Sequence, residues 1–176
     1  GGGMILVPFL SFLFTLYGFE SSVVVHIAIA TSMATILFTS LSSVRAHHQR
    51  GAVRWDIVIT LAPGILIGGI LGGGKLFAIL KTAWLSFIFA GFVSFSAYQM
   101  LMNKKPKPSR TLPSKTGMFG VGGFIGFLSS LVGAGGGFVS VPFMTWCNIS
   151  MHNAVATSAA LGFPIALSSA IGYIIS

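Results

Sequence analysis

Two runs of three glycines, each followed shortly by Val-Pro, are the residues whose types and spacing most suggest chemistry. A glycine run at membrane depth exposes backbone N–H groups, which is tolerated only where the backbone lines a cavity or is buried in protein. If Phe138 begins a half-helix, its N-terminus presents unpaired donors and a positive dipole end, a natural site for an oxyanion. Glycines that only permit close helix packing are the alternative. Because the run occurs twice, we predict that it binds substrate through Gly1, Gly2, Gly3, Pro8, Gly135, Gly136, Gly137 and Pro142.

Hydroxyl side chains follow each glycine run in an Ala-Thr-Ser motif, at residues 30–32 and 156–158. Hydroxyls in a membrane helix often bond only to their own backbone or join neighbouring helices. Repetition of the motif favours substrate contact instead. We therefore add Thr31, Ser32, Thr157 and Ser158 to the candidate binding residues.

Two histidines, His26 and His152, stand at equivalent places near the start of the Ala-Thr-Ser helices. A histidine there could contact an anion or shuttle a proton, and a simple polar cap is an equal alternative. Each lies five residues before the threonine of its motif, and five residues advance about 500° around a helix. The histidines therefore need not face the cavity that the threonines face.

Enzymatic, metal and redox chemistry find little support in the remaining residues. The acids are Glu20 and Asp56, which flank the apolar stretches, and Cys147 is the single cysteine. Paired carboxylates for general acid–base catalysis and a metal-ligand cluster cannot be assembled from these. We expect that the protein holds no cofactor or metal and is not an enzyme. A serine with a histidine would be the only conceivable pair of catalytic residues for an intramembrane hydrolase.

The elements that must position these residues are membrane helices. Of 176 residues, 54% are hydrophobic and 7% are charged, whereas a soluble domain is roughly a quarter charged. Stretches long enough to cross a bilayer, about 20 residues, occur at 22–44, 57–80, 83–102 and 153–175. Residues 1–18 and 117–147 are also apolar, but glycines and a proline break each, and we expect the pieces of 117–147 to be too short to cross in full. The predicted fold is an all-α, polytopic helical bundle.

The formal charge of +8 is concentrated in two short stretches, which hold eight of the ten basic residues: Arg45, Arg50 and Arg54, and Lys104, Lys105, Lys107, Arg110 and Lys115. Basic loops beside hydrophobic spans follow the positive-inside rule. We therefore expect loops 45–56 and 103–116 to be cytoplasmic, with the spans 57–80 and 83–102 crossing between them. The expected partner is the lipid bilayer rather than nucleic acid, which requires charge on a folded face with stacking aromatics.

The chain contains two diverged copies of one unit. Residues 1–10 match 135–144 at six of ten positions, and 26–44 match 152–170 without a gap at nine of nineteen; chance would give roughly one or two. We predict a first repeat at 1–102, a basic loop at 103–116 and a second repeat at 117–176. Each copy looks cut, and we expect a fragment lacking both ends. One crossing within 117–147 would make the copies parallel and a re-entrant hairpin would invert them; we favour inversion, because Gly133 to Gly137 breaks the helix.

These motifs carry a family resemblance. Gly-Ala-Gly-Gly-Gly-Phe at 133–138, with Val-Pro and then Ala-Thr-Ser after it, and the counterpart in the first half resemble the TauE/SafE sulfite exporter family. The stretch from Thr31-Ser32 through His47, Gly51, Val53 and Trp55 to the glycines after Pro63 also looks like that family's first half. The resemblance covers nearly the whole chain. It implies a bacterial inner-membrane permease with a duplicated bundle, for sulfite or organosulfur anions such as sulfonates or sulfoacetate, and the candidate residues above match the motifs expected to line its central site.

The predicted function is that of a permease that exports or exchanges small anions by alternating access between two repeats. Two parts of the family pattern are missing from this sequence, and we therefore expect that this piece does not transport by itself. One is the terminal segments, and the other is a counterpart, in the second copy, of the basic loop at Arg45 to Arg54. A passive anion channel and a non-transporting membrane subunit, whose glycines serve packing, are the alternatives. The oligomeric state, the direction of transport and the coupling ion are left open.

Overall fold

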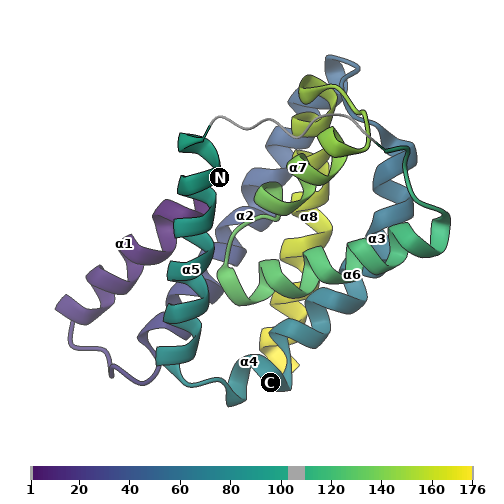
Figure 1. Cartoon of the computed structure of the whole chain (residues 1–176). Coiled ribbons are helices and arrows are strands. Elements are labelled where there is room, and N and C mark those ends of the chain that lie inside the picture. Colours follow the sequence, from purple (N-terminus) through teal and green to yellow (C-terminus); the bar gives the residue numbers. More distant parts are fainter. Residues whose placement is uncertain (1, 103–109, 176) are drawn as a thin grey trace.

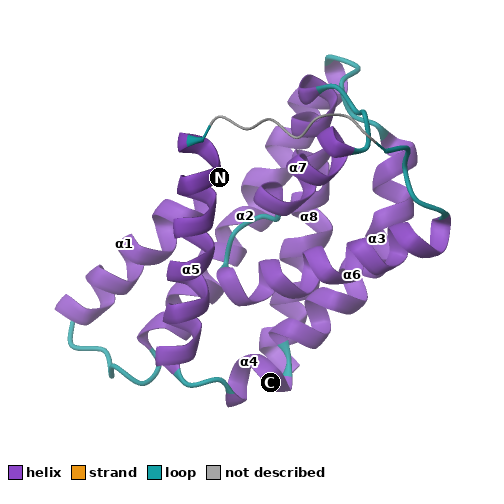
Figure 2. Ribbon diagram, in the orientation of Figure 1, coloured by secondary structure: helices purple, strands orange, loops and turns teal. Residues whose placement is uncertain are grey.

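A computed structural model describes residues 2–102 and 110–175, so Gly1, residues 103–109 and Ser176 lie outside the described residues. The described chain folds into helices joined by loops and turns (Figure 2). The helices are α1 (Gly2–Leu16), α2 (Val24–Gln49), α3 (Trp55–Gly73), α4 (Lys75–Ile79), α5 (Thr82–Leu101), α6 (Lys115–Val132), α7 (Gly137–Trp146) and α8 (Met151–Ile175).

Four segments of the described chain are long and apolar enough to cross a membrane: α2, α3 with α4, α6 and α8. Shorter apolar helices are α1 and the Thr82–Phe95 part of α5. The prediction of an all-α, multi-pass membrane protein is thus confirmed. The expectation that both pieces of 117–147 are too short holds for the ten residues of α7 but is wrong for the 18 residues of α6. Glycines 120, 122, 123 and 126 do not interrupt α6. Gly122 and Gly126 instead pack directly against the backbone of α3.

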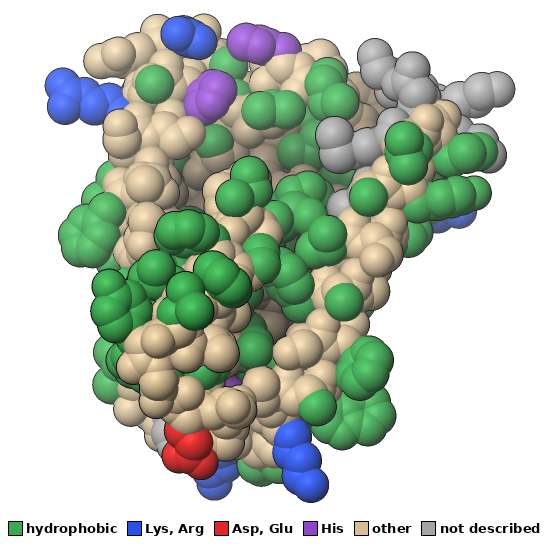
Figure 3. Space-filling model, turned by 90° about the vertical axis from the view of Figure 1, so that its left-hand side faces the viewer, with side chains coloured by type: hydrophobic (Ala, Val, Ile, Leu, Met, Phe, Trp, Pro, Cys, Tyr) green, Lys and Arg blue, Asp and Glu red, His purple; other side chains and the backbone are tan. Residues whose placement is uncertain are grey.

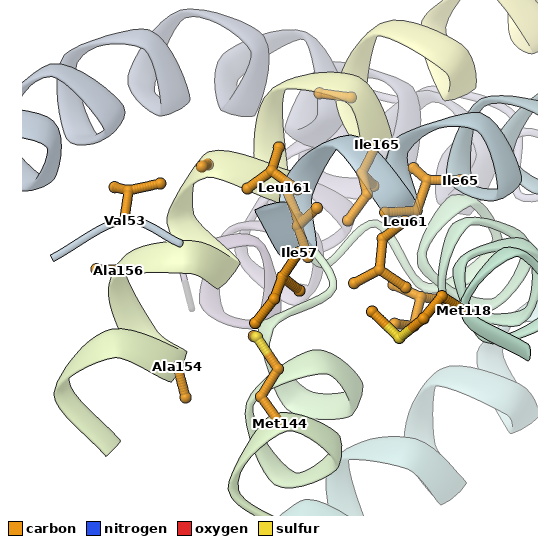
Figure 4. Close-up of a cluster of buried hydrophobic side chains, with 14 of the residues drawn as sticks. Val53, Ile57, Leu61, Ile65, Met118, Met144, Ala154, Ala156, Leu161 and Ile165 are labelled. Atoms are coloured by element: carbon orange, nitrogen blue, oxygen red, sulfur yellow. The ribbon is translucent and has the colours of Figure 1, made fainter. Parts of the chain in front are cut away.

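The apolar core lies where α3 and α8 meet, with α6 and α7 against them (Figure 4). Ile57, Leu61 and Ile65 are spaced four residues apart, which places their side chains along one face of α3. They pack with Leu161 and Ile165 of α8, and all five are fully buried. This shared core fixes the position of α8, which carries the second Ala-Thr-Ser motif.

Helices α3 and α6 cross with their backbones in contact. A Cβ atom at Gly64 would overlap the carbonyl oxygen of Phe119, and one at Gly68 would overlap that of Gly123. From the other side, Gly126 leaves no room for a Cβ beside the Ile65 carbonyl oxygen. Small residues are a general device for bringing membrane helices close. The glycines of α3 therefore serve close helix packing.

The two Ala-Thr-Ser helices, α2 and α8, run in opposite directions (Figure 1). At the start of α2, the ring of His26 lies 4.9 Å from that of Phe77. The Phe77 ring lies 4.4 Å from Tyr173, near the end of α8. Further along, Ser40 of α2 faces Gly162 in the first half of α8, where a Cβ would lie 3.5 Å from the Ser40 Cβ. The helices are therefore antiparallel neighbours.

The described parts of both basic loops lie at one end of the bundle, which we call the basic end. It comprises the end of α2, the start of α3 and the end of α7. Arg110 donates its backbone N–H to the Trp146 carbonyl at 3.4 Å and places its guanidinium 4.8 Å from the centre of the Trp146 ring. Arg54 forms an ion pair with Asp56 at 2.8 Å. On the face in Figure 3, charged side chains lie mainly toward the two ends, with hydrophobic side chains between them.

The glycine crossing predicts a position-dependent response to alanine. Gly68→Ala or Gly126→Ala must push α3 and α6 apart, and overpacking of this kind costs about 1–3 kcal/mol. We expect each variant to melt at a lower temperature in detergent than the unmodified protein. Gly91→Ala and Gly120→Ala are matched controls, since a Cβ at either position meets nothing within 4 Å. Equal melting temperatures for Gly68→Ala and Gly91→Ala would contradict the crossing.

Candidate functional site

The break between α6 and α7 is the centre of the candidate site. Gly133 and Gly136 have φ angles of 72° and 73°, in the left-handed region that glycine adopts without steric cost. The chain thereby leaves α6 and enters α7 within a few residues. Gly136 caps α7 without a side-chain hydrogen bond, and the first N–H groups of a helix have no partner within the helix. The N–H groups of Gly137 and Phe138 are therefore the donors that this helix end offers to a ligand.

The start of α1 meets this break, so the two glycine motifs come together in space. A Cβ atom at Gly3 would overlap the Gly133 carbonyl oxygen and would lie 3.1 Å from the Ala134 Cα. Val7 packs on the same turn, where its Cγ2 atom would be 2.9 Å from a Cβ at Gly133. The first described turn of α1 and the break before α7 thus lie at one place in the bundle. Gly1, the first residue of the first motif, lies outside the described residues.

Equivalent serines contact equivalent glycines in the two copies. A Cβ at Gly3 would lie 3.1 Å from the Ser32 hydroxyl oxygen, and one at Gly137 would lie 3.3 Å from that of Ser158. Both serines are buried. Ser32 also donates a hydrogen bond to the Gly133 carbonyl oxygen at 3.0 Å, which joins α2 to the break. The structure therefore brings together the serine of each motif and the glycines predicted to act with it.

Ser140 is a further polar residue of this site that the sequence did not single out. Its hydroxyl donates to the Gly136 carbonyl oxygen at 3.0 Å and lies 2.8 Å from the Ser158 hydroxyl. The residue lies in the first turn of α7 and is fully buried. Leu6 occupies the matching position in the first copy, so comparison of the copies gave no signal. Its place three residues after Gly137 was the only available indication.

The threonines of the two motifs make structural contacts. Thr31 donates to the Ile27 carbonyl of its own helix at 2.7 Å. The Thr157 hydroxyl is fully buried and accepts the backbone N–H of Arg54 at 3.0 Å, at the start of α3. These contacts tie each hydroxyl to backbone, and a substrate contact for either threonine stays a prediction.

The prolines of the glycine motifs lie within α1 and α7 rather than at the starts of these helices. Pro8 is exposed on α1, and Pro142 is half-buried in α7. Gly2 is also exposed, whereas Gly135 is half-buried beside Ile36, whose Cγ2 atom would lie 3.6 Å from an added Cβ. The glycines that converge on the break are thus Gly3 and Gly133 to Gly137.

The two histidines lie at opposite ends of the bundle, away from the break. His26 packs against α4, where its Nε2 atom lies 2.9 Å from the Leu80 carbonyl oxygen and 3.1 Å from that of Phe77. His152 is exposed in the first turn of α8, at the basic end. The structure does not bring either histidine together with the glycine motifs.

The electrostatic character of the break favours an anion. A helix N-terminus carries roughly half a positive charge, and that of α7 lies here. The carboxylates, Glu20 and Asp56, are exposed at the ends of the bundle, and Asp56 is paired with Arg54. The backbone N–H groups of Gly137 and Phe138 are donors suited to the oxygen atoms of a small oxyanion, whereas the hydroxyl protons of Ser32 and Ser140 are given to the carbonyl oxygens of Gly133 and Gly136. No cluster of three metal-ligating side chains occurs among the residues that the structure describes.

Known proteins resemble the chain over most of its length. It is 34% identical over 181 residues to a Haemophilus influenzae protein named "Probable membrane transporter protein", covering 100% of this chain and 67% of that protein. It is 28% identical to the "Probable membrane transporter protein YdhB" of Bacillus subtilis, covering 99% of this chain and 71% of the relative. A Methanocaldococcus jannaschii protein, "Probable membrane transporter protein MJ0441", is 29% identical over 90% of this chain and 59% of its own length. No solved structure matches.

The family assignment covers every residue. The family described as "Sulfite exporter TauE/SafE" matches the chain over residues 1–176. This match agrees with the helical, multi-pass fold and with the names of the relatives. The chain therefore belongs to the sulfite exporter TauE/SafE family of membrane transporters.

Proposed function

We propose that this chain provides the anion-binding centre of a permease that exports or exchanges small anions by alternating access. The observation that carries the proposal is the meeting of both glycine motifs at the N-terminus of α7, at one break in the bundle. A buried serine stands beside each glycine motif, and the carboxylates lie at the ends of the bundle. Donors of this kind bind oxyanions in many proteins.

The proposed substrates are sulfite and organosulfur anions such as sulfonates or sulfoacetate. Each presents three oxygen atoms on one sulfur, which can accept hydrogen bonds from several converging donors at once. The N–H groups at Gly137 and Phe138 are donors of that type, and the hydroxyls of Ser32 and Ser158 would join them by exchanging their acceptors, the Gly133 carbonyl and the Ser140 hydroxyl, for the anion. The description of the family supports a sulfur oxyanion, whereas the names of the relatives specify membrane transport alone.

Inverted repeats at 1–102 and 117–176 are the proposed basis for alternating access. The antiparallel course of α2 and α8 supports inversion. The equivalent contacts of Gly3 with Ser32 and of Gly137 with Ser158 support a common origin of the copies. Transporters built from inverted repeats hold substrate near the membrane midplane, in helices broken at that depth, and move one repeat against the other. Helices α1 and α7 are the proposed half-helices.

The basic end is proposed to face the cytoplasm of a bacterial inner membrane. Arg45, Arg50 and Arg110 are exposed there, and positively charged loops are retained on the cytoplasmic side. In this orientation the chain enters α6 and leaves α7 on the same side of the membrane. The reason is that Arg110, which precedes α6, is in contact with the end of α7.

Removal of either buried serine hydroxyl should weaken anion transport. Ser32→Ala and Ser158→Ala each delete a donor in the proposed site, and loss of a buried hydrogen-bond partner costs about 1–3 kcal/mol, roughly a 5- to 150-fold change in affinity. We expect a higher KM for labelled sulfite uptake into proteoliposomes that contain the protein. Ser42→Ala, an exposed serine on the same helix as Ser32, is the control. Unchanged uptake by both buried-serine variants would place the site elsewhere.

Counterflow distinguishes the proposed carrier from its alternatives. A carrier that exchanges anions takes up labelled substrate faster when unlabelled substrate is inside the vesicle, because its site returns loaded. A passive channel shows no such stimulation. If sulfite, sulfonates and other small oxyanions all give flux no higher than empty liposomes, the chain is a membrane subunit whose glycines serve packing.

Cysteine accessibility tests the inverted arrangement. In a Cys147→Ala background, we expect Met151→Cys and Gln49→Cys to react with an impermeant maleimide from one side of the membrane and Ser21→Cys from the other. All three positions are exposed, and the Cys147→Ala change removes the native thiol. Labelling of positions 151 and 49 from opposite sides would rule out inversion.

A further inference from the structure

Ser129, in the last turn of α6, places a further hydroxyl at the break. The residue is 4% exposed, so it is almost completely buried. A Cβ atom at Gly136, the residue that caps α7, would lie 3.1 Å from the Ser129 hydroxyl oxygen. This oxygen is therefore within about 5 Å of the Gly136 Cα, since a Cα–Cβ bond adds about 1.5 Å at most. Ser129 belongs to neither the glycine motif nor the Ala-Thr-Ser motif.

The surroundings of this hydroxyl leave its proton without an acceptor. The added Cβ atom at Gly136 would also overlap the Ile165 Cδ1 atom and lie 3.2 Å from the Ile125 Cγ2 atom. Methyl groups cannot accept a hydrogen bond. Within the described ranges 2–102 and 110–175, no group forms a hydrogen bond with the Ser129 side chain. Because a buried polar group without a partner is destabilising, the hydroxyl is poised to bind a ligand that supplies an acceptor.

The other serines of the break already have hydrogen-bond partners. Ser32 and Ser140 each donate to a backbone carbonyl oxygen at 3.0 Å, and the Ser158 hydroxyl lies 2.8 Å from that of Ser140. Each of these hydroxyls must exchange an existing hydrogen bond in order to bind an anion. Ser129 has no such bond to lose, so a hydrogen bond from Ser129 to an anion is a net gain.

We propose that the Ser129 hydroxyl binds the anion together with the N-terminus of α7. This inference rests on the proposed function and deepens it by adding a binding residue to the same site. The first N–H groups of α7, at Gly137 and Phe138, are two donors, and the Ser129 hydroxyl is a third. Three donors that have no intrahelical partner to give up match the three oxygen atoms of sulfite or of a sulfonate group.

Ser130, the next residue of α6, provides a matched reference. It is fully buried, and its hydroxyl donates to the Phe127 carbonyl oxygen of its own helix at 2.7 Å. The same hydroxyl lies against Gly72 of α3, where an added Cβ would overlap it. The two neighbouring serines therefore have opposite roles: Ser130 packs α6 on α3, and Ser129 faces the break. Ser130→Ala removes a buried hydroxyl from α6 without touching the proposed site.

The melting temperature of the anion-free protein in detergent separates a ligand contact from a structural one. Ser129→Ala deletes a buried hydroxyl that has no partner, so we expect this variant to melt at the wild-type temperature or above it. A hydroxyl that held the fold through a hydrogen bond would lower the melting temperature on removal. A decrease on Ser129→Ala would therefore contradict the proposal.

Titration with sulfite at constant ionic strength tests binding through the rise in melting temperature that a ligand of the folded state produces. We expect wild-type protein and Ser130→Ala to give similar apparent Kd values. For Ser129→Ala the apparent Kd should rise roughly 10- to 150-fold, because a hydrogen bond to a charged group is lost.

Two results of the titration would overturn the assignment, and they differ in what else they remove. Equal apparent Kd values for Ser129→Ala and the wild-type protein would exclude Ser129 from the site and leave the proposed function standing. The absence of any sulfite-dependent shift in the wild-type protein would remove the binding role of Ser129 together with the proposed sulfite site.

Discussion

The Gly133 carbonyl is the constraint on which the arrangement of the helices depends. It ends α6 inside the bundle, where an unsatisfied backbone group costs several kcal/mol because no water is available. Ser32 of α2 satisfies this oxygen, and Gly3 of α1 lies against it because it has no Cβ. One backbone acceptor thus brings three helices and both glycine motifs together. The first N–H groups of α7, those of Gly137 and Phe138, begin four residues further on and lie at the same break.

Contact between helix backbones supplies the rigidity around this break. Association of helices in a membrane relies on close packing, because lipid tails are as apolar as the side chains they replace. The α3–α6 crossing achieves that closeness at Gly64, Gly68 and Gly126. The apolar core holds α8 on the other side of α3. Helix α6 is thereby fixed along its length, so that its end, and with it the break, is held in place.

Composition was sufficient to predict three of the four candidate membrane spans of the described chain, those of α2, of α3 with α4, and of α8. The sequence could not indicate that α6 stays intact through its glycines, since the reason is contact with α3, a helix about 50 residues earlier. It could not locate the partners of Thr157 and His26 either, because Arg54 and Leu80 reach them only through the fold. Local patterns specify elements, whereas these contacts depend on the distances between them.

Several matching residues of the two copies make different contacts in the structure. Thr31 bonds within its own helix, whereas Thr157 caps α3. His26 contacts the carbonyl oxygens of Phe77 and Leu80, whereas His152 is exposed. The contact of a motif glycine with the motif serine takes the same form in both halves, Gly3 with Ser32 and Gly137 with Ser158. This shared contact is the feature of the two copies that supports the proposal that both glycine motifs act on one ligand.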